Sequence, residues 1–92
     1  NSFVPDKFTL KQNYPNPFNP STLIRFTVPE NSYVSLKIFD QTGKEIASLI
    51  NENKTKGYYE INFDGSALTS GVYYYSLRAN GLTATRRMVL LK

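Results

Sequence analysis

The sequence predicts an all-β domain built as two packed antiparallel sheets. No segment longer than a single strand shows helical periodicity, and turn-forming residues recur about every 8 to 14 residues. The composition is that of a β-sheet protein, with 14% aromatic residues, including seven tyrosines and six phenylalanines. About seven strands fit this spacing, which is the number of an immunoglobulin-like sandwich, here without its disulfide because the chain has no cysteine.

The predicted strands follow from alternating apolar and polar residues. They lie at 8–13, 22–28, 33–39, 45–50, 57–64, 71–79 and 82–92. Side chains two residues apart share one face of a strand, so the alternation also predicts the core. Val34, Leu36 and Ile38 are expected on the core side, and Tyr73 and Tyr75 in the core. Three sets of residues are each expected to share one face of their strand: Thr22, Ile24, Phe26 and Val28; Tyr59, Ile61 and Phe63; and Tyr73, Tyr75 and Leu77.

The segment 14–20 contains three prolines at alternate positions. Proline has no backbone N–H and a fixed φ, so this segment is excluded from the middle of a sheet. We expect a stiff connector that crosses between the sheets, with Tyr14 and Phe18 holding it on the core.

The remaining connections carry recognisable turn chemistry. Asp40 is expected to cap the 40–44 hairpin and Gly43 to take its left-handed position. In the strand 45–50 the sequence does not settle which side chains face inward between Ile46 and Leu49, which predicts a bulge. We expect 51–56 to be an exposed polar loop and 65–70 to cross between sheets. Asn80-Gly81 predicts a two-residue type I′ hairpin.

Length and composition exclude several functions. Ninety-two residues hold one core, and no apolar run is long enough to span a membrane. No signal peptide is visible at the start. Histidine and cysteine are absent, which removes serine–histidine and cysteine–histidine catalysis and thiolate zinc sites. The seven carboxylates fall mostly in turns or on outward positions, and a calcium ion between Asp40 and Glu45 is a minor alternative. We therefore expect no catalytic site, metal or cofactor.

The net charge of +4 is a mild surplus whose meaning depends on its distribution. Arg86 and Arg87 are adjacent in the last strand, so they should point to opposite faces, with one leaning over the sheet edge. Basic residues there commonly protect an edge from aggregation. Nucleic-acid binding is disfavoured because the neighbouring tyrosines are expected in the core. An aromatic sugar platform using Tyr33, Tyr58 or Tyr74 remains an alternative.

Four motifs, in order, resemble those of one family. The segment 12–22, with Pro15, Asn16 and Pro17, resembles the "QNYPNPFNPST" opening of the type IX secretion system C-terminal sorting domain, type A. The hairpin with Asp40, Gly43 and Lys44 resembles its D-x-x-G-[KR] turn. The segment 70–77, with Gly71, Tyr73, Tyr75 and Leu77, resembles its "SGVYxYxL" strand, and 86–92 resembles its closing "KMVLLK". The resemblance covers nearly the whole chain from about residue 8.

This resemblance implies an immunoglobulin-like fold and a role in export. Such domains sit at the C-terminus of larger proteins, mostly in Bacteroidota. The type IX translocon recognises them after the parent reaches the periplasm, and the cargo then crosses the outer membrane. A sortase-like protease at the surface commonly removes the domain, leaving the cargo anchored or released. On this reading residues 1–7 are a linker from the cargo and 8–92 are the sorting domain.

The expected partners are the translocon, the sortase-like protease and the cargo domain of the same chain. Direct translocon contacts are expected in the last strand, by strand addition or carboxylate capture, through the residues Arg86, Arg87, Met88, Val89, Leu90, Leu91 and Lys92. The other motif residues are expected to serve the fold. A monomer or a weak edge-strand dimer is expected. The alternative function is a cell-surface adhesion or carbohydrate-binding module.

Overall fold

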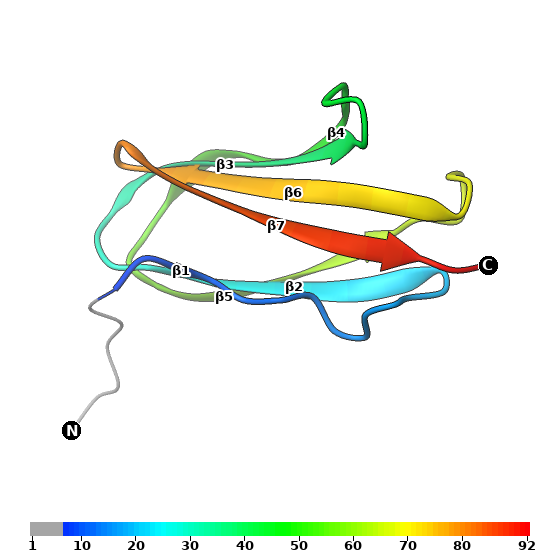
Figure 1. The fold of residues 1–92 in the computed structure, drawn as a ribbon. Coiled ribbons are helices and arrows are strands. Elements are labelled where there is room, and N and C mark those ends of the chain that lie inside the picture. Colours follow the sequence, from blue (N-terminus) through cyan, green and yellow to red (C-terminus); the bar gives the residue numbers. More distant parts are fainter. Residues whose placement is uncertain (1–6) are drawn as a thin grey trace.

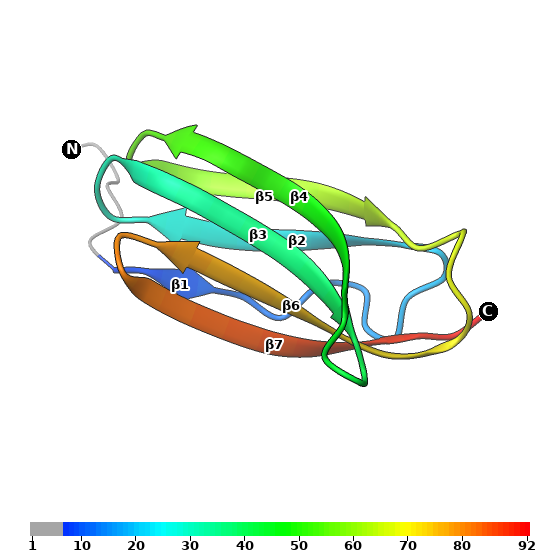
Figure 2. The same ribbon diagram turned by 90° about the horizontal axis from the view of Figure 1, so that it is seen from above.

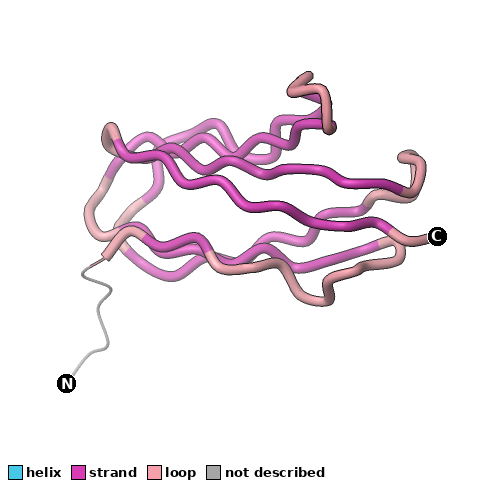
Figure 3. Tube along the Cα trace, viewed as in Figure 1, coloured by secondary structure: helices cyan, strands magenta, loops and turns pink. Residues whose placement is uncertain are grey.

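The protein is an immunoglobulin-like β-sandwich of seven strands (Figures 1 and 3). The structure is a computed structural model that describes residues 7–92. Residues 7–92 contain no helix. The strands are β1 (Thr9–Leu10), β2 (Ser21–Val28), β3 (Ser32–Asp40), β4 (Glu45–Lys54), β5 (Gly57–Asp64), β6 (Gly71–Ala79) and β7 (Leu82–Leu90).

The strands form two antiparallel layers. One sheet has the order β1-β2-β5, and the other has the order β4-β3-β6-β7. The two views show β4 lying over β5 on one flank and β7 lying over β1 on the other (Figures 1 and 2). The segment 65–70 crosses between the sheets, as predicted, because it joins β5 of one layer to β6 of the other. The same expectation for 14–20 was wrong, because this segment joins β1 to β2 within one sheet and only touches the other sheet where Phe18 pairs with β7.

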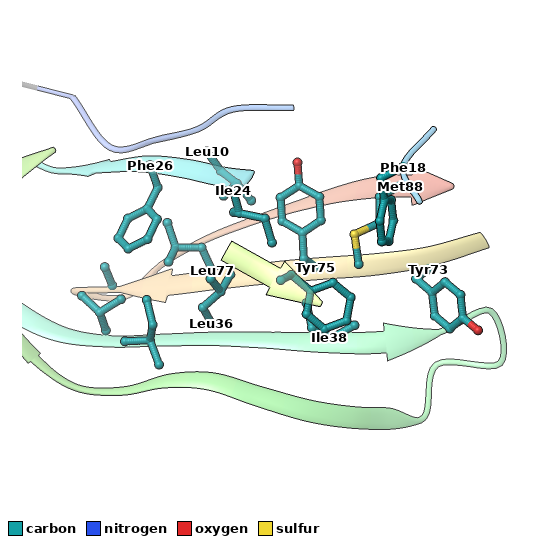
Figure 4. Close-up of a cluster of buried hydrophobic side chains, with 14 of the residues drawn as sticks. Leu10, Phe18, Ile24, Phe26, Leu36, Ile38, Tyr73, Tyr75, Leu77 and Met88 are labelled. Carbon is teal, nitrogen blue, oxygen red and sulfur yellow. The ribbon is translucent and has the colours of Figure 1, made fainter. Parts of the chain in front are cut away.

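Alternation places the core between the layers as the sequence predicted. Ile24, Leu36 and Leu77 are completely buried, and the Tyr75 ring stands among them (Figure 4). Opposite faces of the same strands carry polar residues, such as the Arg25–Glu60 pair at 2.9 Å across β2 and β5. Burial of this apolar set is the main stabilising contribution to the fold. The core comprises Leu10, Phe18, Ile24, Phe26, Val28, Val34, Leu36, Ile38, Ile50, Phe63, Tyr73, Tyr75, Leu77, Ala79, Met88 and Leu90.

Two predicted strand boundaries were wrong. β1 is only two residues long, because regular pairing with β2 is interrupted after Leu10 and resumes only as an isolated bridge between Tyr14 and Leu23. β4 continues through Lys54, where an exposed loop was expected. Asn51, Glu52 and Asn53 pair with β3 over this stretch. An edge strand near the end of a sandwich has solvent on most sides, so its polar sequence resembles that of a loop.

The predicted turn chemistry is confirmed. The Asp40 carboxylate accepts hydrogen bonds from the Thr42 N–H at 2.9 Å and from the Lys44 N–H at 3.1 Å. Gly43 has φ +89°, and Asn80 and Gly81 have φ +51° and +79°, as a type I′ hairpin requires. The β3–β4 register shifts twice, which leaves Ile46 and Leu49 as the extra residues of β4.

Candidate recognition site at the terminal strand

The last strand lies at a sheet edge, but the proline segment covers half of that edge. The Phe18 N–H donates to the Val89 carbonyl at 2.9 Å, and the Leu91 N–H donates to the Phe18 carbonyl at 3.0 Å. This pairing is parallel and joins residues that lie far apart in the sequence. We call this contact between 12–18 and 87–91 the seam.

Two side chains that precede Phe18 in the sequence extend the seam. The Asn16 side-chain oxygen accepts from the Val89 N–H at 2.9 Å. The Gln12 side-chain amide donates to the Arg87 carbonyl at 2.6 Å. The outward backbone groups of β7 from the Arg87 carbonyl to the Leu91 N–H are therefore already bonded. A partner strand could pair here only by displacing the proline segment, which argues against the expected strand addition at this part of β7.

A buried polar network holds the start of the seam against the core. The Asn13 backbone N–H donates to the Tyr75 hydroxyl at 2.7 Å, and that hydroxyl donates to the Lys11 carbonyl at 2.7 Å. The Asn13 side chain donates to the Pro15 carbonyl at 3.1 Å and to the Thr22 hydroxyl at 3.0 Å. Every buried polar side-chain atom in the described residues has a partner. The network thus fixes the path of the chain into the prolines.

Arg86 and Arg87 point to opposite faces, as their adjacency predicted. Arg86 leans over the edge, and its Nε donates to the Leu10 carbonyl at 2.6 Å, which links β7 to β1. Burial raises the pKa of the Tyr75 phenol, while the Asn13 hydrogen bond and the nearby Arg86 charge act in the opposite direction. Arg86 therefore contributes to the contact between the sheets. Among residues 7–92 the Arg87 side chain makes no ion pair or side-chain hydrogen bond.

The remaining terminal residues divide into buried and exposed sets. The side chains of Met88 and Leu90 are fully buried, so the folded domain offers neither to a partner. Val89 is half-buried, and its backbone belongs to the seam. Leu91 is 55% exposed although apolar. Lys92 is exposed, but its Nζ donates to the Ser66 carbonyl at 2.5 Å. Of the seven expected contact residues, Arg86, Arg87, Leu91 and Lys92 are exposed, and Arg86 and Lys92 use their side chains in bonds within the domain.

The proline segment is attached by Phe18 and not by Tyr14. Phe18 is 1% exposed and packs edge-on against Phe63, with ring centroids 6.1 Å apart. Tyr14 was also expected to hold the segment on the core, but this residue is 70% exposed and only its backbone is paired, with Leu23. Pro15, Asn16 and Pro17 are exposed on the outer side of the segment.

Gly65 is a structural residue that the sequence did not single out. Its N–H donates to the Pro20 carbonyl at 2.7 Å. A Cβ at this position would lie 3.2 Å from the Phe18 ring and 3.3 Å from the Pro20 carbonyl oxygen. Glycine here lets the 65–70 crossing pass close beneath the seam. Without the structure nothing distinguishes this glycine from an ordinary turn residue.

The other motif residues lie away from the seam and serve the fold. Hydrogen bonds from Thr42 and Lys44 hold the pKa of Asp40 below its usual value. Gly71 starts β6, and a Cβ there would meet no neighbour within 4 Å, so it has no close-packing role. The Tyr73 hydroxyl donates to the Thr69 carbonyl at 2.7 Å, and Leu77 is buried in the core. Lys44 is exposed in the hairpin.

The alternative sites considered from the sequence do not assemble. Tyr33 and Tyr58 belong to different sheets, and Tyr74 is paired with Phe39, six residues along β3 from Tyr33. That separation is roughly 20 Å along a strand, so the tyrosines do not form one platform. Glu45 pairs with Lys37 at 3.2 Å instead of sharing an ion with Asp40. Across residues 7–92 no cluster of metal-binding side chains is present. Within the same range, no helix is long and apolar enough to cross a membrane.

Comparison with known proteins points to one family. A family model described as the secretion system C-terminal sorting domain matches residues 12–91. One similar solved structure comes from work on PorZ of Porphyromonas gingivalis, described as an essential bacterial surface component of the type-IX secretion system. It aligns with a TM-score of 0.62 and 21% identity, over 95% of this chain and 12% of that chain. At this identity the likeness shows the fold alone. No curated protein sequence matches the chain.

Proposed function

Because this chain belongs to the family of secretion system C-terminal sorting domains, which are the sorting signals of type IX secretion, we propose that the translocon recognises its folded surface at the C-terminal end of β7. The family is not one of enzymes, and its role implies export to the cell surface or the medium.

The seam is the observation that supports recognition of a folded shape. It joins the first and last motifs of the family match through backbone pairing and the side chains of Gln12 and Asn16. Neither motif can take this form without the other. A receptor that binds where they meet therefore distinguishes the folded domain from an unfolded or shortened chain.

The accessible residues beside the seam are the candidates for direct contact. Arg87 supplies a positive charge without a side-chain partner in the described residues, and Leu91 supplies an exposed apolar group. The backbone of Leu91 is fixed by Phe18, so its side chain is displayed in a defined position. Arginine is enriched in protein interfaces, and apolar groups form their buried centre. Lys92 adds a second charge next to Leu91.

The route and fate of the parent follow from the family role. The parent would reach the periplasm first and cross the outer membrane through the translocon, which reads this domain. A sortase-like protease would then remove the domain, leaving the cargo anchored or free. The expected linker lies at 1–7, of which residues 1–6 are outside the described part of the chain. Lys7 is exposed, so the chain is accessible where the fold begins.

The test is export of a reporter. A signal peptide and a fluorescent protein are fused ahead of residues 1–92 in a host with a type IX system and in its translocon-null mutant. We expect the reporter outside wild-type cells and in the periplasm of the mutant. The mass of the exported reporter shows whether the domain is removed. Periplasmic retention in both hosts, with a folded domain, would contradict the proposal.

Reversing the charge of Arg87 tests whether this residue belongs to the surface that the translocon contacts. Arg87→Glu should reduce export at least severalfold while the circular dichroism spectrum stays that of the wild type. Arg78→Glu is the matched control, because Arg78 is an exposed arginine on the neighbouring strand β6, away from the seam. Equal export by both variants would remove Arg87 from the contact surface and leave the sorting function itself untouched.

A further inference from the structure

The four sheet edges of this sandwich differ in how well they are protected. The second half of β7 is covered by the seam, Arg86 reaches from β7 to the Leu10 carbonyl of β1, and β1 is only two residues long. β4 carries two register shifts, which disturb regular pairing along an edge. β5 is paired with β2 over all eight residues without a register shift. It contains no proline or lysine, which are the residues most often used to block an edge, and its charged residues are Glu60 and Asp64.

The direction of the backbone groups on β5 follows from bonds at its neighbour. Leu23 of β2 exchanges both backbone bonds with Tyr14, so its peptide groups face the β1 side. Backbone groups alternate along an antiparallel strand, so those of Ile24 and Phe26 face β5. Their partners are Ile61 and Tyr59. The backbone groups of Tyr58, Glu60 and Asn62 therefore point away from the sheet.

This flank also leaves apolar side chains incompletely covered. Tyr59 and Ile61 of β5 face inward but are only half-buried, whereas their β2 partners Phe26 and Ile24 are 1% and 0% exposed. Ile46 and Leu49 of β4, on the same flank, are half-buried as well. A strand added beside β5 would cover the inner face of this edge.

We propose that β5 is a homodimerisation edge, at which two copies pair antiparallel and join their smaller sheets into one six-stranded sheet. Identical strands related by a two-fold axis must pair outward residues with outward residues. A register centred on Glu60 places two glutamates opposite each other, and one centred on Asn62 places Glu60 opposite Asp64 of the partner subunit. The register centred on Ile61 avoids both repulsions.

The favoured register gives each outward residue a suitable neighbour. Glu60 lies opposite Asn62 of the partner subunit, and Tyr58 lies opposite Asp64 of the partner subunit. On the inner face Ile61 lies opposite Ile61 of the partner subunit, and Tyr59 opposite Phe63 of the partner subunit. The two copies would thus add apolar contacts at the half-buried positions. One strand pair is a small interface, so we expect dissociation in the range of about 10 µM to 1 mM.

Sedimentation equilibrium of the 92-residue chain over this concentration range measures the dimer directly. Asn62→Pro removes an outward N–H that β5 does not use internally, and proline is tolerated at such edge positions. We expect a folded monomer from this variant. A wild-type chain that stays monomeric at about 1 mM, or a dimer that Asn62→Pro leaves unchanged, would overturn the proposal.

Introducing a charge at position 62 tests the proposed register between the two β5 strands. Asn62→Lys places a lysine opposite Glu60 of the partner subunit twice, and should tighten the dimer by roughly fivefold. Asn62→Glu should weaken it by a similar factor, and both shifts should shrink in high salt. Thr83→Lys and Thr83→Glu are matched controls at an exposed strand position on the opposite flank, and should leave the dimer unchanged. Shifts of the same sign from both Asn62 variants would overturn the register.

Discussion

The backbone N–H of Asn13 donates a hydrogen bond to the hydroxyl of Tyr75, which lies 62 residues further along the chain. The same hydroxyl donates to the Lys11 carbonyl, so one phenol oxygen satisfies two backbone groups at the point where the chain leaves the smaller sheet. Tyr75 is completely buried. Its oxygen therefore fixes the start of the proline segment as well as filling the core.

Removing this hydroxyl should destabilise the domain. Tyr75→Phe keeps the ring but leaves the Asn13 N–H and the Lys11 carbonyl without their partner. We expect a loss of about 1–3 kcal/mol in the free energy of unfolding, measured by urea titration. Tyr74→Phe is the control, because Tyr74 lies on the outer face of the same strand. A Tyr75→Phe variant as stable as this control would show that the hydroxyl does not hold the segment.

The same residue predicts a decrease in stability at alkaline pH. Burial raises the pKa of Tyr75 above its ordinary value of 10.0, so the folded state favours the protonated phenol. The stabilisation that comes from burying the protonated Tyr75 phenol is complete below pH 10. It is lost as the pH rises from there through the pKa of Tyr75 in the folded state. The free energy of unfolding of the wild type should therefore fall more steeply than that of Tyr75→Phe above pH 10. Parallel curves for the two proteins would contradict this assignment.

The seam should protect the edge of β7 from exchange with solvent. Asn16→Ala removes the acceptor of the Val89 N–H, and we expect the hydrogen exchange of that amide to rise about three- to tenfold. Asn19→Ala is the matched control, since Asn19 is exposed in the same segment and its side chain makes no bond to the described residues. The measurement is the hydrogen-exchange rate of the Val89 amide by nuclear magnetic resonance in each variant. Equal rates in the two variants would mean that the Asn16 bond does not hold the strand.

Deletions at the end of the chain should separate folding from recognition. Removing residues 88–92 takes out Met88 and Leu90, each worth about 2–5 kcal/mol in a core, and should unfold so small a domain. Removing residues 91–92 takes out exposed side chains and should leave a folded domain with reduced export. Circular dichroism and the reporter assay together check this pair. A folded domain without residues 88–92, or full export without residues 91–92, would contradict the respective expectation.

Local sequence patterns predicted the strands and turns because these depend on neighbouring residues. Two-residue alternation gave the inward face of β3 through Val34, Leu36 and Ile38, all completely buried. Turn chemistry gave Gly43 and the Asn80-Gly81 hairpin. The adjacency of Arg86 and Arg87 gave their opposite directions. The β4 extension was missed because its edge residues are polar like those of a loop.

The seam could not be predicted because its contacts join distant residues. Gln12 and Arg87 are 75 positions apart, and nothing in either neighbourhood specifies the other. The burial of Phe18 and the exposure of Tyr14 likewise depend on how the segment lies against the two sheets. The prolines indicated a connector but not the strand that it would cover. Consequently, the terminal strand resembled an open edge in the sequence, while in the structure much of it is covered.

The seam also sets the time at which the domain can be completed during synthesis. Its upstream half, 12–18, leaves the ribosome long before Val89 and Leu91, which it must bond. Until those residues emerge, the segment can pair with β2 through Tyr14, but Phe18 has no strand to pair with. A nascent or prematurely stopped chain therefore carries most of the domain without the finished seam. If the translocon recognises the seam as proposed, such a chain should not be exported.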